Sequence, residues 1–139
     1  MMKSKKGFTL IEIMIAISIA IILAVIIIFV IKPAQILANA RDSQRNVHVQ
    51  SIYSIIKQYN YLNEGVLPIC FIGKVADEFF DIKECETDLV PYFINELPLD
   101  PIYGTTEITG YLIKKNAEGK IGIKADYHEG EVEIGAGYY

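Results

Sequence analysis

The stretch FTLIEIMIAISIAIILAVIIIFVI, residues 8–31, decides how this 139-residue chain is organised, because it holds only one charged side chain, Glu12. As a helix, its 24 residues would be about 36 Å long at about 1.5 Å per residue. The hydrocarbon core of a bilayer is about 30 Å thick. Lys3, Lys5 and Lys6 precede the stretch, and positive charge stays on the cytoplasmic side of a membrane. We therefore expect a membrane-spanning helix with the rest of the chain outside the cytoplasm.

A secretory signal peptide and a plain membrane anchor are the alternatives for this segment. A signal peptide has an apolar core of about 7–15 residues followed by a small-residue cleavage site. Here the apolar run is longer and continues into IKPAQ. A plain anchor does not account for Glu12, because a carboxylate near the centre of an apolar helix costs about 2.5–3.5 kcal/mol, and less near an end. An acid in this position needs a partner.

The residues around Glu12 read KKGFTLIE, and this run resembles the processing site of type IV prepilins and secretion pseudopilins. The resemblance implies that a membrane prepilin peptidase cuts after Gly7 and methylates the new N-terminal amine of Phe8. Glu12 is then the fifth residue after the cut, where the family carries the acid that attracts the Phe8 amine of a neighbouring subunit. Breaking such a pair typically costs about 3–5 kcal/mol. The implied parts are a leader (1–7), a transmembrane and filament-core helix (8–31), and an amphipathic helix with a globular head (32–139).

The remainder of the chain predicts an α+β head. Pro33 predicts a kink. Apolar residues then recur at three- and four-residue steps, which predicts an amphipathic helix over residues 34–62. Alternating patterns predict strands at 108–115, 120–127 and 131–134, the first two joined by a turn at 116–119. The expected fold is pilin-like: a long hydrophobic-then-amphipathic N-terminal helix packed on a small antiparallel sheet.

Two further segments are similar to parts of pseudopilins. One is the charged run with Arg41, Asp42 and Arg45, for which a solvated helix face is the simpler interpretation and a set of contacts between subunits the alternative. The other is LPLDP, residues 97–101, in which two prolines three residues apart favour an extended path. We interpret LPLDP as a turn and not as a site.

Cys70 and Cys85 are the only cysteines, and the predicted topology places both where disulfides persist. A bond between them would close a ring of about 15 residues and contribute roughly 3 kcal/mol in the chain-entropy model. Two unpaired thiols are the alternative. We expect the disulfide.

The sequence gives little support for enzyme activity, metal binding or nucleic-acid binding. We expect no enzyme activity and no cofactor, because no nucleophile motif, P-loop or paired-histidine helix is present. The acidic stretch from Asp126 to Glu133 lacks the dense spacing of oxygen ligands that calcium loops use, so we expect no metal. After Ile31 there are 10 Lys and Arg against 16 Asp and Glu, which argues against direct nucleic-acid binding.

The sequence therefore predicts a structural subunit of a type IV pilus-like or secretion pseudopilus filament. It would cross the inner or plasma membrane once, with its head extracytoplasmic, and then enter a cell-surface or periplasmic filament. The expected partners are membrane lipid before assembly, other copies and related pilins, the prepilin peptidase, an inner-membrane platform protein and an assembly ATPase. The alternative is a membrane-anchored extracytoplasmic ligand-binding module that does not polymerise.

Overall fold

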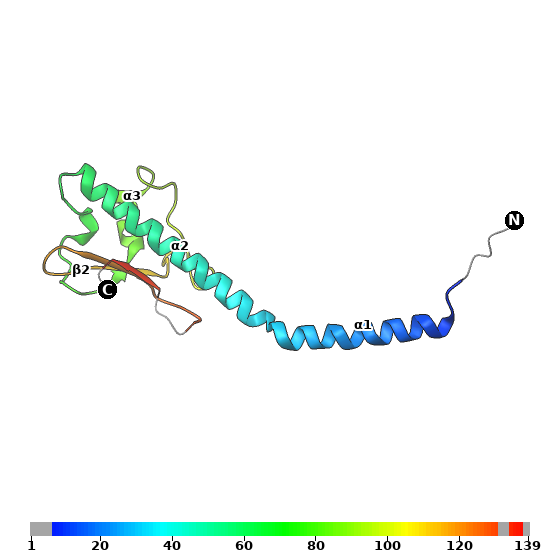
Figure 1. The fold of residues 1–139 in the computed structure, drawn as a ribbon. Helices are drawn as coiled ribbons and strands as arrows, with labels where there is room; N and C mark the ends of the chain where they lie inside the picture. The colour runs from blue at the N-terminus through cyan, green and yellow to red at the C-terminus, as the bar shows by residue number, and fades with distance from the viewer. Residues whose placement is uncertain (1–6, 131–133, 138–139) are drawn as a thin grey trace. The chain divides into compact units, whose positions relative to one another are not determined.

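The computed structural model describes residues 7–130 and 134–137. It divides into two compact units, Met1–Leu37 and Ala38–Tyr139. The first contains helix α1 and the first turns of α2, and the second contains the rest of α2 and all strands (Figure 1). We describe each unit by itself.

Helix α1 spans Leu10–Ile31, so the predicted apolar helix is confirmed, with its start two residues later than the apolar run. Its end is set by Lys32, which adopts a left-handed conformation with φ 47° and breaks the helical repeat. Helix α2 begins at the next residue, Pro33, which suits the first position of a helix because its missing N–H is not needed there. The interruption expected at the proline thus lies one residue before it.

Helix α2 spans Pro33–Leu62, close to the predicted range. It ends where Glu64 and Gly65 both adopt positive φ and the Gly65 amide donates to the Asn60 carbonyl at 2.8 Å. Residues 63–65 therefore cap the C-terminal end of α2.

The sheet is a four-stranded antiparallel meander in the order β1-β2-β3-β4. The strands are β1 (Phe80–Asp81), β2 (Tyr111–Lys115), β3 (Ile121–Ala125) and β4 (Gly135–Gly137). A turn joins β2 to β3, in which Gly119 has φ 76° and the Asn116 amide donates to the Lys120 carbonyl at 2.9 Å. The α+β class and the antiparallel sheet are as predicted, and β1 is a strand that the sequence did not reveal.

The first two predicted strands are shorter in the structure, at 111–115 instead of 108–115 and at 121–125 instead of 120–127. The prediction began the first at residue 108, but Gly110 has φ 81° and the carboxylate of Asp81 accepts the amides of Thr109 and Gly110. Those amides are therefore not available for hydrogen bonds to a neighbouring strand. Of the third predicted strand, residues 131–133 lie outside the described residues, and the strand that the structure shows there begins at Gly135.

One face of α2 and one face of the sheet enclose the core of the head (Figure 1). Val49, Ile52, Ile55 and Ile56 are the buried apolar residues of α2. The largest fully buried apolar side chains of the sheet are Tyr111, Ile113 and Ile123. The spacing 49-52-56 along α2 places these residues on one side of the helix, as an amphipathic helix requires.

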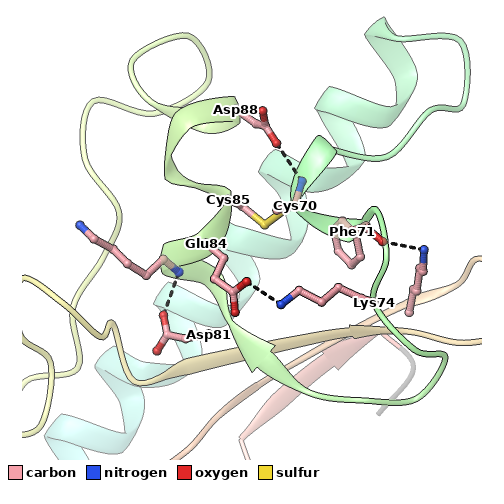
Figure 2. The surroundings of a disulfide bond; sticks show 9 residues. Cys70, Phe71, Lys74, Asp81, Glu84, Cys85 and Asp88 are labelled. Carbon is pink, nitrogen blue, oxygen red and sulfur yellow. Dashed lines mark hydrogen bonds and ion pairs between the residues drawn. A yellow bond between two sulfur atoms is a disulfide. The ribbon is translucent and has the colours of Figure 1, made fainter.

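A covalent ring closes one end of the core. Cys70 and Cys85 form a disulfide with their Cα atoms 5.0 Å apart, so the predicted bond is confirmed (Figure 2). The ring contains strand β1, part of the short helix η1 (Ile69–Phe71) and all of the short helix η2 (Ile82–Cys85), and α3 (Glu86–Leu89) follows it. Asp88 accepts the Cys70 amide at 3.2 Å (Figure 2), so a hydrogen bond accompanies the covalent link.

Candidate functional site

The predicted processing residues lie at the start of the first unit. Gly7 and Phe8 precede α1 and are exposed, with Phe8 78% exposed. Thr9 is the N-cap of α1, and its hydroxyl accepts the amide of Glu12 at 3.3 Å. The Gly7–Phe8 bond lies outside any helix or strand and is exposed, which fits the requirement of a peptidase for accessible backbone.

Glu12 occupies the first turn of α1, where helix amides point toward it and the positive end of the helix dipole favours a carboxylate. Thr9 and Glu12 also have the T-x-x-E spacing of a capping box. The structure shows the bond from the Glu12 amide to the Thr9 hydroxyl. This bond uses the backbone of Glu12, so the cap belongs to Thr9. The carboxylate of Glu12 is stabilised within its own helix by the helix dipole, which the sequence prediction did not consider.

Helix α1 has no buried residues. Each residue of the described N-terminal unit from Gly7 to Leu37 is exposed. Within residues 7–130 and 134–137, α1 is the one helix that is long and apolar enough to cross a membrane. It fits a single-pass membrane anchor.

In the head, the structure shows a buried ion pair that the sequence prediction missed. Arg45 is 0% exposed although it lies on α2 among residues interpreted as a solvated face. Its Nε donates to Asp100 Oδ2 at 2.6 Å and its Nη2 donates to Asp100 Oδ1 at 3.2 Å. Because both side chains are fully buried, the interpretation of Arg45 as surface charge is wrong.

The LPLDP segment supplies the acid of this pair. The backbone amides of Ile102 and Tyr103 each donate to Asp100 Oδ1 at 2.9 Å, so these two amides hold the carboxylate in position. Residues 97–100 form no helix, strand or turn, and the turn lies at 101–103. The segment also holds a buried charged group, which the prediction did not consider.

The guanidinium of Arg45 also bonds to two acids that are themselves partly exposed. Its Nη1 donates to Asp42 Oδ1 at 2.8 Å and to Glu129 Oε1 at 3.2 Å. Arg41 donates two hydrogen bonds to Glu129, each 2.5 Å long. Asp42 accepts the amides of Glu129 and Gly130. We call Arg41, Asp42, Arg45, Asp100 and Glu129 the Arg45 cluster, which joins α2 to two loops.

The electrostatics of the cluster agree with its geometry. Hydrogen bonds from Arg41 and Arg45 lower the pKa of Glu129 to about 2. Burial raises the pKa of Asp100, but the hydrogen bonds from Arg45 and from the two loop amides outweigh it, so this pKa lies below its usual value. The same competition between burial and the hydrogen bond from Arg45 lowers the pKa of Asp42. All three acids are therefore charged at neutral pH.

His48 and the acids do not gather into a metal site. The Nδ1 of His48 lies 2.7 Å from the hydroxyl of Tyr111, and burial lowers the pKa of the imidazole. Among the described residues no group of three His, Cys, Asp or Glu side chains is arranged to hold a metal ion. Residues 131–133 of the acidic stretch lie outside this statement.

Comparison with protein families matches residues 2–28 to the prokaryotic N-terminal methylation motif. The chain has a type IV prepilin-like N-terminus. The matched range contains Gly7, Phe8, Glu12 and most of α1. Comparisons with curated proteins and with solved structures gave no match, so the prepilin-like assignment rests on the N-terminal segment and on the α+β architecture.

Proposed function

We propose that this prepilin-like chain is a structural subunit of a type IV pilus-like or secretion pseudopilus filament. The prepilin peptidase cuts it after Gly7, methylates the amine of Phe8, and leaves α1 as the assembly helix. The observation that carries this proposal is the methylation motif over residues 2–28, which begins before an apolar helix that is exposed on every side.

The exposure of α1 supports the proposal that this helix lies first in lipid and later among other helices in the filament. An apolar helix without a buried face is stable in lipid, or among other helices that cover it, and is not stable in water. Lipid is the environment before assembly. In a filament, the α1 helices of other copies or of related pilins replace lipid as the cover.

Glu12 would set the position at which one subunit docks on another as it moves from lipid into the filament. Cleavage after Gly7 creates a positive amine on Phe8, four residues before the Glu12 carboxylate. Pairing this amine with the Glu12 of another subunit offsets the cost of burying both charges, which is large for an unpaired group. A platform protein and an assembly ATPase in the inner or plasma membrane would move the paired subunit out of lipid, with the head extracytoplasmic.

The test compares Glu12→Ala with Thr9→Ala in cells that carry the assembly machinery. We expect Glu12→Ala to be inserted and cleaved but to yield few or no filaments by electron microscopy of sheared material. Thr9→Ala removes the helix cap and keeps the carboxylate, so it should still assemble. Equal loss in both variants would assign Glu12 to helix capping and overturn its role between subunits.

N-terminal sequencing separates the filament subunit from a plain membrane anchor. The proposal requires the mature chain to begin at Phe8 with a methylated amine. A mature chain that begins at Met1 and retains the lysines would refute it in favour of an anchored binding module.

A further inference from the structure

A groove of about 510 Å³ lies on the head where the C-terminal half of α2 faces the start of β3. Tyr53, Lys57 and Asn60 line it from α2. Lys120 and Ile121 line it from the strand side, and Gly137 of β4 leaves that part of the wall without a side chain. All of these residues belong to the second compact unit.

The two lysines of the groove differ from three other lysines of the head. Lys74, Lys83 and Lys114 each lie within 4.0 Å of a carboxylate. For Lys57 and Lys120 the structure shows no such ion pair within residues 7–130 and 134–137, and both are exposed. The Nζ of Lys57 lies 5.4 Å from the centroid of the Tyr53 ring.

The charge of the groove is opposite to that of the head around it. Residues 32–139 carry 10 basic and 16 acidic side chains, so the surface is acidic as a whole. The described lining of the groove contains two basic residues and no Asp or Glu. The groove of one head is therefore complementary in charge to acidic segments on the head of another copy.

We propose that this groove binds an acidic segment of a second copy of the chain. The ammonium groups of Lys57 and Lys120 would meet its carboxylates, and the ring of Tyr53 would cover the methylene groups beside them. The inference rests on the proposed function, because a filament keeps heads at the high local concentration that such exposed ion pairs need.

Zero-length carbodiimide coupling tests the contact in filaments of the full chain. It joins an amine to a carboxylate only where the two already touch. Filaments mixed from ¹⁴N- and ¹⁵N-labelled subunits would identify links between copies by mass spectrometry. We expect links from Lys57 or Lys120 of one copy to an Asp or Glu of another.

Charge reversal provides the second measurement. We expect Lys57→Glu with Lys120→Glu to lower the filament yield at least tenfold, and the matching double change to Arg to restore it. The control, Lys74→Glu with Lys83→Glu, alters net charge by the same amount outside the groove and should retain more of the yield. Near-UV circular dichroism and the intact disulfide would confirm that each variant folds.

The outcomes separate this inference from the proposed function. Wild-type filaments without links between copies from either lysine would overturn the groove contact and leave the filament function standing. A groove variant that assembles like the wild type would overturn the groove contact in the same way. A wild-type chain that is correctly processed but forms no filaments would overturn both.

Discussion

Replacing Arg45 with Met tests whether the buried ion pair holds the head together. Methionine keeps an unbranched apolar stem in place of the arginine methylenes and lacks the guanidinium group, so the change removes the charge, its hydrogen bonds and the volume of that group. It leaves the Asp100 carboxylate, which is 0% exposed in its side chain, without its guanidinium partner. Removing one partner of a buried pair typically costs about 3–5 kcal/mol. A domain has only about 5–15 kcal/mol of stability, so the loss is a large share.

Urea and thermal unfolding of the full chain in detergent would measure this loss. The chain has nine tyrosines and no tryptophan, and near-UV circular dichroism of the tyrosines reports on head packing while α1 remains helical. A loss of about 3 kcal/mol lowers the melting temperature of a domain of this size by roughly 12 °C or more. The matched control is Arg41→Met, which removes a partly exposed guanidinium bound to Glu129 and should shift the midpoint far less.

The double variant Arg45→Met with Asp100→Asn sharpens the test. Asparagine keeps an oxygen for the amides of Ile102 and Tyr103, and it removes the uncompensated charge. We expect the double variant to be more stable than the sum of the single losses predicts. A cost below about 1 kcal/mol for Arg45→Met, or strict additivity in the cycle, would refute the reasoning from burial.

Two other perturbations follow from the same structure. Reducing the Cys70–Cys85 bond, or replacing both residues with Ser, should cost roughly 3 kcal/mol because the ring spans 15 residues, and unfolding with and without reductant measures it. Acid should also weaken the head: the pKa values of Glu129 and Asp100 lie below their unfolded values, so their contribution is present above about pH 4 and is lost as the pH falls toward about 2. Urea midpoints between pH 6 and pH 2 would show this decline, and Asp100→Asn should flatten it.

Composition and topology were sufficient to predict the parts of the fold with strong signals. The run from Phe8 to Ile31 predicted an apolar helix, and the expected extracytoplasmic placement of the head predicted the pairing of Cys70 with Cys85. The turn between β2 and β3 was visible in its residue types, with Gly119 at positive φ.

The Arg45 cluster was missed because a helical wheel assigns an arginine to the polar face. Arg45 nevertheless stands four residues before Val49 and seven before Ile52, which is the spacing of the core stripe. Its acid, Asp100, is 55 residues away in the sequence, and no local pattern connects the two. Strand β1 was missed for a related reason, because two residues are too few to show an alternating pattern.

The disulfide ring also changes what a single cut in the backbone would do to this protein. Ile72 and Val75 are 77% and 66% exposed, and both lie between Cys70 and Cys85. A protease that hydrolyses one bond in this exposed stretch adds one water to the mass and separates no fragment, because the sulfur bridge still joins the two pieces. A head attacked by proteases would thus survive nicking in this exposed stretch as one covalent molecule.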